Sequence, residues 1–462
     1  MEDFSLQEVI TATKGKWLGN TDPNQIFPTG GERDNRTLKK GELFFALPGE
    51  HVDGHQFIDE ALKSGASAGI VSRQWFEAQN DRPPKPLIIV ESPELAMGDV
   101  ARAYRKKFDI PVIGITGSNG KTTTKDMVDA VLKTQYHILV TEGNLNNQLG
   151  VPLTLFRLNA QHEVAVIEMG ISDFGEMQYL CDIAQPTIGI ITNVGPTHLE
   201  FLGSVEGVAK AKGELLEYLD ESSMTILNLD DLLLSKERVK VKGRLLGFGI
   251  ERNSQFRGEG LSLNQERRGH FTLQGRFFKL TVPGRHNVYN ALAAATAGVA
   301  LHVPLENAAK ALANFEPTKL RSQVLSQNGL HLINDTYNAN PASMQAALDV
   351  LADIEIPEGG RRIAILGDMR ELGEITDQAH QDLGKETASK ADVLFALGDH
   401  AHLVIEAAQS AGLSSTMSHA FTDSEALIST LKEFITSGDT LLIKGSRGLA
   451  MEHIVEALGF KL

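Results

Sequence analysis

Short apolar runs rich in valine and isoleucine alternate with longer helix-like segments along most of the chain. Examples are LFFALPG at 43–49, HEVAVIEMG at 162–170 and RRIAILGDM at 361–369. Such runs are typical of strands that are buried on both faces, and the segments between them have the length of helices that cover a parallel sheet. The sequence therefore predicts an α/β protein with mostly parallel sheets flanked by helices.

The chain has 462 residues, a length that suggests about three domains at roughly 150 residues each. Pro111 disfavours helix at Ile110, which makes this position a plausible boundary, and a third block of strands and helices begins near Pro317. We predict an N-terminal domain at 1–109, a central domain at 110–314 and a C-terminal domain at 315–462. Short alternating runs between about 235 and 285 further predict a local antiparallel sheet.

The composition is acidic and includes a single cysteine. A formal net charge of −15 argues against a general nucleic-acid-binding protein, because phosphate backbones are bound by basic surfaces. Cys181 cannot form an intramolecular disulfide, and we expect it to be a small buried residue. The start MEDFSLQEVITATKG has no signal-peptide core, and no run of about 18 apolar residues predicts a membrane span. These features predict a cytoplasmic protein.

The strongest local signal is GITGSNGKTTT at 114–124, which follows a buried strand and opens a helix. Glycines there let backbone N–H groups face a phosphate, and the helix adds its positive end. Lys121 supplies a charge for the β- and γ-phosphates, and the Thr122 hydroxyl can bind Mg²⁺. The predicted nucleotide-binding residues are Gly114, Thr116, Gly117, Ser118, Asn119, Gly120, Lys121, Thr122 and Thr123. Ile115 departs from the G-x-x-x-x-G-K-[ST] pattern, and the alternative is a glycine-rich turn with a solvated lysine.

A carboxylate at the end of a neighbouring strand is the usual partner of such a loop, because it helps to hold Mg²⁺. VAVIEMG places Glu168 directly after four apolar residues, where an ionised carboxylate needs a partner. Taken alone, Glu168 could equally be a surface residue at the end of a strand. The phosphate loop in the same block favours the metal interpretation.

Longer motifs resemble the Mur ligases of peptidoglycan synthesis, and the resemblance covers nearly the whole chain. The motifs are DNRTLKKGELFFALPGEHVDGHQFIDEAL, GITGSNGKTTTKDM, TEGNLNNQLGVPLTL, HLEFLGSVEGVAKAKGEL, GRHNVYNALAA, NDTYNANPASMQAAL, LGDMRELG and LIKGSRGLAME. The resemblance implies a central P-loop ATP-binding domain and a Rossmann-like C-terminal domain.

The resemblance also implies an ATP-dependent, ADP-forming peptide ligase. ATP would phosphorylate the terminal carboxylate of UDP-MurNAc-tripeptide, and the amine of D-Ala-D-Ala would attack the resulting acyl phosphate. The expected cofactors are ATP and one or two Mg²⁺ ions, and the expected assembly is a monomer that binds these small-molecule substrates.

Residue roles follow where the motifs match. His198 resembles the family's second-metal histidine, and Lys212 resembles the lysine that is carbamylated in several Mur ligases. Lys210 points to a different side of the same helix, so only one of the two lysines can have that role. The resemblance thus implies a catalytic group of Lys121, Glu168, His198 and Lys212, and metal ligands Thr122, Glu168, His198 and Lys212.

Other positions resemble nucleotide and substrate contacts. Asn290 resembles a residue that reads adenine, and Arg321 and Asp335 resemble nucleotide contacts from the third domain. The expected substrate-binding residues are Asp34, Asn35, Arg36, Asn144, Asn146, Asn147, Tyr337, Asn338, Asn340, Lys444, Ser446 and Arg447. Asn35 departs from the usual Asp-Ser-Arg or Asp-Thr-Arg, which leaves its contact open.

Two alternative functions share the ATP site. Another Mur-type ligase, or a ligase similar to folylpolyglutamate synthase, would differ in the amine acceptor. A nucleotide-dependent switch would bind ATP without ligase chemistry, but it would leave Glu168, His198, Lys212 and Asp335 unexplained as a set. Because the motifs lie in all three blocks, we expect catalysis to require domain closure.

Overall fold

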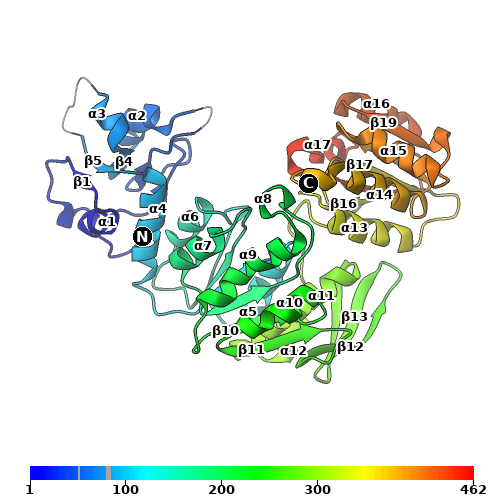
Figure 1. Ribbon diagram of the computed structural model, residues 1–462, viewed down its shortest axis with the longest axis horizontal. Helices are drawn as coiled ribbons and strands as arrows, with labels where there is room; N and C mark the ends of the chain where they lie inside the picture. Colours follow the sequence, from blue (N-terminus) through cyan, green and yellow to red (C-terminus); the bar gives the residue numbers. More distant parts are fainter. Residues whose placement is uncertain (50–51, 80–84, 462) are drawn as a thin grey trace.

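The computed structural model describes residues 1–49, 52–79 and 85–461, and Figure 1 shows three sheet-based domains that follow one another along the chain. Glu50 and His51 of the first motif lie outside the described residues. The N-terminal sheet has the order β1-β5-β4-β3-β2, and within it only the β1–β5 pair is antiparallel. Its elements are α1 (Leu6–Thr13), β1 (Lys16–Trp17), η1 (Pro23–Gln25), β2 (Gly31–Glu32), β3 (Leu43–Phe45), η2 (Gly54–Phe57), α2 (Ile58–Lys63), β4 (Ala68–Ser72), α3 (Arg73–Glu77), β5 (Leu87–Val90) and α4 (Pro93–Arg105).

The central domain contains a nine-stranded sheet of order β14-β13-β12-β11-β10-β9-β6-β8-β7. The strands from β7 to β12 are parallel, whereas β12, β13 and β14 pair antiparallel. The predicted antiparallel segment is therefore confirmed, and it extends the parallel sheet. The elements are β6 (Val112–Thr116), α5 (Lys121–Leu132), β7 (Ile138–Val140), α6 (Gly150–Leu155), β8 (Val164–Glu168), α7 (Glu176–Ala184), β9 (Ile188–Ile191), α8 (Leu199–Leu202), α9 (Val205–Tyr218), β10 (Met224–Asn228), α10 (Leu232–Glu237), η3 (Arg238–Lys240), β11 (Arg244–Gly249), β12 (Phe256–Leu263), β13 (Arg268–Leu273), β14 (Arg276–Pro283), α11 (Arg285–Ala300) and α12 (Leu305–Ala313).

The C-terminal domain contains a six-stranded sheet of order β15-β16-β20-β17-β18-β19, in which only β15 is antiparallel to its neighbour. Its elements are β15 (Gln323–Gln327), β16 (Leu330–Asn334), α13 (Pro341–Asp353), β17 (Arg362–Gly367), η4 (Gly373–Ile375), α14 (Thr376–Ala388), β18 (Val393–Leu397), α15 (Ala401–Ser410), η5 (Ser415–Met417), β19 (Ser418–Phe421), α16 (Ser424–Phe434), β20 (Thr440–Lys444), η6 (Arg447–Leu449) and α17 (Glu452–Ala457). Helices α13, α14 and α15 contribute to the core on one face, and α16 and α17 contribute to the core on the other. This arrangement confirms the predicted Rossmann-like layering.

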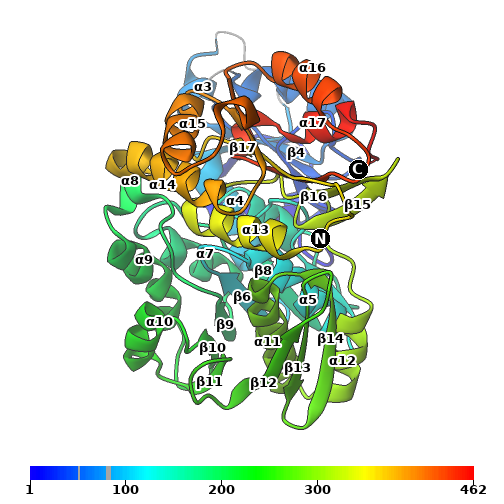
Figure 2. The same ribbon diagram turned by 90° about the vertical axis from the view of Figure 1, so that its right-hand side faces the viewer.

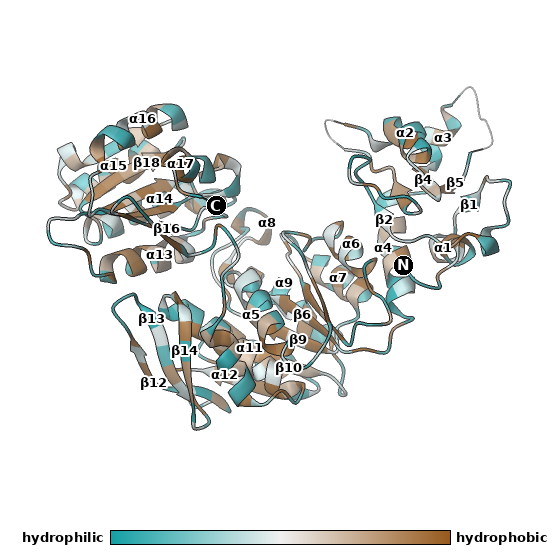
Figure 3. Ribbon diagram, turned by 180° about the vertical axis from the view of Figure 1, so that it is seen from behind, coloured by the Kyte–Doolittle hydropathy of each residue, from teal (hydrophilic) through white to brown (hydrophobic). Residues whose placement is uncertain are grey.

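The interior strands are mainly hydrophobic (Figure 3), and most of their side chains are fully buried. This burial on both faces explains why the strands appear in the sequence as continuous apolar runs. Figure 2 shows α13 on the side of the C-terminal domain that faces the central domain. The boundaries predicted at 109/110 and 314/315 stay predictions. Within the described ranges, no helix combines the length and apolar character needed to cross a membrane.

Candidate active site

The phosphate loop joins β6 to α5 and packs closely on its neighbours. Gly117 and Gly120 have φ values of +150° and +78°, which side-chain-bearing residues rarely adopt. A Cβ atom on Gly117 would lie 1.9 Å from Oγ1 of Thr192, and one on Gly120 would lie 2.4 Å from Oδ1 of Asn290. The loop therefore needs glycine at both positions, and it presents the first turn of α5, where backbone N–H groups lack helical partners.

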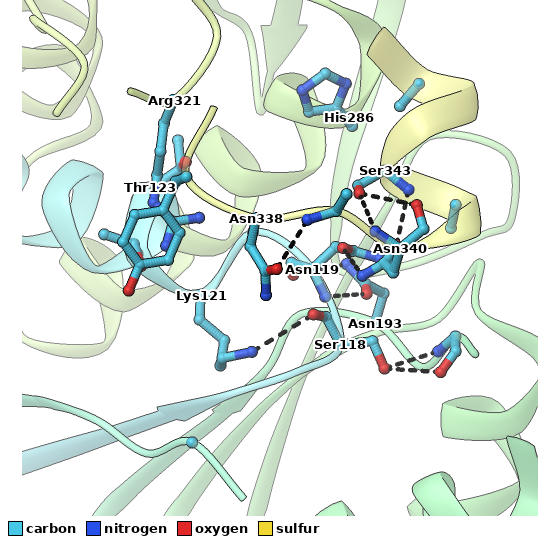
Figure 4. Close-up of a pocket in the computed structure, with 18 of the residues that line it drawn as sticks. Ser118, Asn119, Lys121, Thr123, Asn193, His286, Arg321, Asn338, Asn340 and Ser343 are labelled. Carbon is cyan, nitrogen blue, oxygen red and sulfur yellow. Dashed lines mark hydrogen bonds between the residues drawn. The ribbon is translucent and has the colours of Figure 1, made fainter. Parts of the chain in front are cut away.

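Residues after β9 hold the first half of the loop (Figure 4). The N–H of Ser118 donates to the carbonyl of Asn193 (2.9 Å), and the N–H of Asn119 donates to Oδ1 of Asn193 (2.9 Å). The Thr192 hydroxyl donates to the carbonyl of Asn119 (2.6 Å), and the Ser118 hydroxyl donates to the carbonyl of Gly195 (3.0 Å). Sequence reasoning missed Thr192, Asn193 and Gly195, although their place directly after a buried strand was an available signal.

Lys121 lies over the loop, and its Nζ donates to the carbonyl of Gly117 at 2.7 Å. Desolvation by burial lowers the pKa of Lys121, and the negative charge of Glu168 opposes this shift. The side chain lines a cavity of about 780 Å³ between the central and C-terminal domains. The predicted site residues on the cavity wall are Ser118, Asn119, Gly120, Lys121, Thr122, Thr123, Asn146, Asn147, Glu168, His198, Asn290, Arg321, Asp335, Tyr337, Asn338, Asn340 and Lys444.

Glu168, at the end of β8, is 1% exposed and has one unpartnered oxygen. Its Oε1 accepts a hydrogen bond from Nδ2 of Asn146 (2.8 Å), whereas its buried Oε2 has no hydrogen-bond partner among the described residues. A buried carboxylate oxygen without a partner is unfavourable unless a cation satisfies it. Thr122 and His198 line the same cavity. Mg²⁺ prefers oxygen ligands, so the Thr122 hydroxyl and the Glu168 carboxylate fit the predicted ion.

Lys212 is a buried lysine on α9 that is not among the residues lining the cavity, although it lies close enough to Lys121 to be influenced by its charge. It is 1% exposed. Burial lowers the pKa of Lys212 well below its usual value, and the charge of Lys121 adds to the shift. Lys210, in contrast, is exposed and lies 5.7 Å from the ring centre of Phe174. Lys212 is thus the lysine that can hold a neutral, nucleophilic amine.

The C-terminal wall of the cavity carries charged and aromatic groups. Nζ of Lys444 lies 2.5 Å from Oδ2 of Asp335 and donates to the carbonyl of Asn338 (2.8 Å). The Arg321 guanidinium lies 3.9 Å from the ring centre of Tyr337, an arrangement that fixes the arginine at the cavity edge shown in Figure 4. This wall can therefore face a charged ligand held by the phosphate loop.

Two polar contacts join the domains beside the loop. Nδ1 of His198 lies 2.5 Å from Oε2 of Glu371, and this neighbour lowers the pKa of Glu371. Both residues have left-handed backbones, with φ values of 54° and 61°. Asn340 donates through Nδ2 to Oδ1 of Asn119 at 2.7 Å. Glu371 was missed by sequence reasoning, because its partner lies in another domain.

Three family descriptions match successive parts of the chain. They are "Mur ligase family, catalytic domain" at 32–105, "Mur ligase middle domain" at 115–298 and "Mur ligase, glutamate ligase domain" at 320–447. The UDP-N-acetylmuramoyl-tripeptide–D-alanyl-D-alanine ligase of Bacillus subtilis (strain 168) is 36% identical over 459 residues, which cover 98% of each chain. The chain belongs to the Mur ligase family.

Solved structures agree with this assignment. MurF from Acinetobacter baumannii superposes with a TM-score of 0.88 at 31% identity, with 98% of each chain covered. MurF from Thermotoga maritima in complex with ADP has a TM-score of 0.80 at 28% identity, covering 93% of this chain and 96% of the other. The three-domain α/β fold predicted from the sequence is thereby confirmed.

Two predicted nucleotide-site residues of this Mur ligase, Gly114 and Thr116, do not line the cavity, whereas Asn290 lines it and also bonds to its neighbours. Gly114 and Thr116 lie inside β6, and a Cβ on Gly114 would come within 2.8 Å of Sδ of Met169, so this glycine serves strand packing. The Asn290 amide donates to Oδ1 of Asn287 (2.9 Å) and accepts from the Thr124 hydroxyl (3.2 Å). These contacts fix α11 against the phosphate loop.

Several predicted substrate residues are not brought to the cavity. Asp34, Asn35 and Arg36 lie in the N-terminal domain, where Arg36 pairs with Asp34 at 2.6 Å. This pairing lowers the pKa of Asp34 to about 2. Asn144, Ser446 and Arg447 also lie away from the cavity wall; Ser446 accepts from the N–H of Arg370, and Arg447 pairs with Glu452.

Asp368, His380 and His400 form a cluster with metal-like spacing in the C-terminal domain. However, Nδ1 of His380 donates to the carbonyl of Thr376 (2.7 Å), and its Nε2 accepts from the N–H of Met369 (3.1 Å). Both ring nitrogens are thus occupied by backbone, and burial lowers the pKa of His380. The cluster holds the loops after β17 and β18 together.

Proposed function

We propose that this Mur ligase joins D-Ala-D-Ala to UDP-MurNAc-tripeptide in peptidoglycan precursor synthesis while converting ATP to ADP and phosphate. The observation that carries the proposal is the cavity in which the phosphate loop and the buried, half-unpartnered Glu168 face the charged wall of the C-terminal domain. The name of the Bacillus subtilis relative states this activity. The ADP complex of Thermotoga maritima MurF supports the use of ATP.

The reaction has two steps. A carboxylate oxygen of the tripeptide attacks the γ-phosphorus, and the bond to the β–γ bridging oxygen breaks to release ADP. The amine of D-Ala-D-Ala then attacks the acyl carbon, the amine loses a proton, and phosphate leaves. Both steps depend on positioning and on neutralising negative charge, which a rigid loop and fixed cations provide.

The chain's own groups divide these tasks. The N–H groups of the first turn of α5, together with Lys121, bind the β- and γ-phosphates. Arg321 compensates charge on the transferring group, and Asp335 faces the ribose hydroxyls. Thr122 and Glu168 would hold Mg²⁺, which would neutralise part of the phosphate charge when it is bound. His198 would hold a second ion.

Lys212 is proposed to carry a carbamate. A neutral lysine amine attacks the carbon of CO₂ and loses a proton, which leaves an anion on the side chain. The lowered pKa of Lys212 keeps the amine neutral, and the nearby positive charge of Lys121 stabilises the anion that forms. The carbamate would then orient charged groups at the metal site.

The remaining assignments concern substrate binding and cell context. Asp34, Asn35 and Arg36 would contact the uridine end, where Nδ2 of Asn35 would exchange its bond to Glu60 for one to the ligand. Because the proposed site residues come from all three domains, domain movement is expected on binding. Asn146, Asn147, Tyr337 and Asn338, which lie on the cavity wall, would contact the peptide. The protein is proposed to act as a monomer. Because its proposed substrates are ATP and a UDP-linked precursor, the protein is proposed to work in the cytoplasm.

An acceptor panel tests the proposal. Phosphate release is measured with ATP, Mg²⁺ and UDP-MurNAc-tripeptide, and with either D-Ala-D-Ala or single amino acids as the acceptor. Release that depends on D-Ala-D-Ala is expected. Release with a single amino acid would identify another ligase, and ATP binding without any substrate-dependent release would favour a nucleotide switch.

A further inference from the structure

We propose that Asn340 is a positioning residue through which the C-terminal domain holds the phosphate loop when the two domains are docked. This inference rests on the proposed ligase function, and it replaces the substrate contact that the sequence suggests for Asn340. It concerns one hydrogen bond, from Nδ2 of Asn340 to Oδ1 of Asn119, at 2.7 Å.

The Asn340 amide is engaged at both ends within the protein. The side-chain Oδ1 of Asn340 accepts from the backbone N–H of Ser343 (2.9 Å), and the backbone N–H of Asn340 donates to the Ser343 hydroxyl (3.0 Å). These two bonds form the capping box at the start of α13. The side chain therefore has a fixed rotamer, and its Nδ2 is directed at the phosphate loop, as Figure 4 shows.

The partner of this bond is an equally fixed part of the loop. The backbone of Asn119 is held at both its polar groups. Its N–H donates to Oδ1 of Asn193, and its carbonyl accepts from the Thr192 hydroxyl. Asn119 is followed by Gly120, which begins the turn into α5. The Asn340 contact thus sets the position of α13 relative to the groups that would bind the phosphates.

The backbones of the two domains also approach one another here. A Cβ atom on Gly195 would lie 3.8 Å from Cβ of Ser118 and 4.0 Å from Cβ of Ala342, the second residue of α13. The start of α13 therefore lies beside both the phosphate loop and the segment after β9 that contains Gly195. Because these groups belong to different domains, the hydrogen bond exists only in the docked arrangement.

One net hydrogen bond changes the ratio of docked to undocked molecules by about 2- to 10-fold. A ligase whose transferring phosphoryl group is bounded by both domains needs the docked form for turnover. Loss of the contact is therefore expected to lower kcat by about this factor and to leave the folding of each domain unchanged.

Two substitutions separate this role from helix capping. Asparagine, aspartate and serine are about equally good N-caps, so Asn340→Ser and Asn340→Asp both preserve the start of α13. Serine is too short to reach Asn119. Aspartate can accept from the Asn119 amide once that amide rotates. Asp353→Asn is the control, because it weakens the exposed interdomain pair with Arg267 (2.6 Å), away from the loop.

The three variants are compared with the wild type by kcat, KM for ATP, thermal unfolding and small-angle scattering with Mg·ADP. Asn340→Ser is expected to lower kcat and to increase the extended fraction, with KM for ATP and the melting temperature unchanged. Asn340→Asp should recover most of the loss, and Asp353→Asn should resemble the wild type.

Three results would overturn the proposal: an unaffected Asn340→Ser variant, equal impairment of the serine and aspartate variants, or equal impairment by Asp353→Asn. Failure of the proposed function is recognised separately. In that case the wild type itself shows no D-Ala-D-Ala-dependent phosphate release, while the scattering comparison still reports on docking.

Discussion

Replacing Lys121 by methionine separates binding chemistry from folding, because methionine keeps most of the apolar stem and removes the charge. Nζ of Lys121 donates to the Gly117 carbonyl (2.7 Å) and more weakly to the Ser118 carbonyl (3.4 Å). Such hydrogen bonds contribute about 0.5–1.5 kcal/mol each in net terms. Burial already disfavours the charged amine, so we expect the free energy of unfolding to fall by no more than about 1.5 kcal/mol.

The effect on turnover should be much larger. Removing one preorganised group that stabilises developing charge costs about 10²- to 10³-fold in kcat, or about 2.7–4 kcal/mol. Phosphate release under saturating substrates gives kcat, and urea unfolding gives the stability of the same preparation. A low kcat in a stably folded protein is the expected combination.

Lys125 offers a matched control on the same helix. It is 4% exposed, its Nζ donates to the Thr141 carbonyl at 2.8 Å, and it does not line the cavity. Lys125→Met should cost about 1–3 kcal/mol of stability by leaving that carbonyl unpaired, with a smaller loss of kcat than Lys121→Met. The reasoning is refuted if Lys121→Met keeps more than about a tenth of wild-type kcat, or if activity simply follows stability in both variants.

Three further substitutions extend the test. Glu168→Gln should lower kcat by at least about 100-fold and weaken its Mg²⁺ dependence, and an unchanged Mg²⁺ titration would count against the metal role. Glu371→Ala should lower kcat by about 10- to 100-fold because it removes the group that orients His198, whereas a normal response to added Mg²⁺ with normal kcat would contradict this. Although desolvation by burial opposes it, hydrogen bonding to Arg361 lowers the pKa of Asp439, so this pair stabilises the fold above the unfolded pKa of about 3.9 and loses its effect as the pH falls through the lowered value. Asp439→Asn should therefore cost about 1–3 kcal/mol in urea unfolding at pH 7, and a deficit that does not shrink as the pH falls below the unfolded pKa would show that the carboxylate is not the cause.

Local chemistry made much of the central domain predictable. The phosphate loop was found because a buried strand, glycines and a helix start follow one another within a few residues, and Glu168 because a carboxylate after an apolar run needs a partner. Ile115, the departure from the loop pattern, is fully buried inside β6. The backbone turns two residues later, at Gly117, so the pattern could lose its first glycine.

Contacts that depend on domain docking were not predictable. Asn119 and Asn340 are separated by 221 residues, and His198 and Glu371 also come from different domains. The residues around Asn340 contain no signal that its side-chain amide contacts the phosphate loop. For this reason the local sequence predicts substrate recognition for Asn340, which stays a prediction, and it gives no sign of the contact of Glu371 with His198.

Oxygen transfer tests the central claim most directly, namely that the γ-phosphoryl group passes to a carboxylate. UDP-MurNAc-tripeptide labelled with ¹⁸O in its terminal carboxylate is incubated with the protein, Mg·ATP and D-Ala-D-Ala, and the released phosphate is analysed by ³¹P NMR. The account predicts one ¹⁸O atom in each phosphate, because the oxygen that attacks phosphorus leaves with it. Amide product accompanied by unlabelled phosphate would contradict the account.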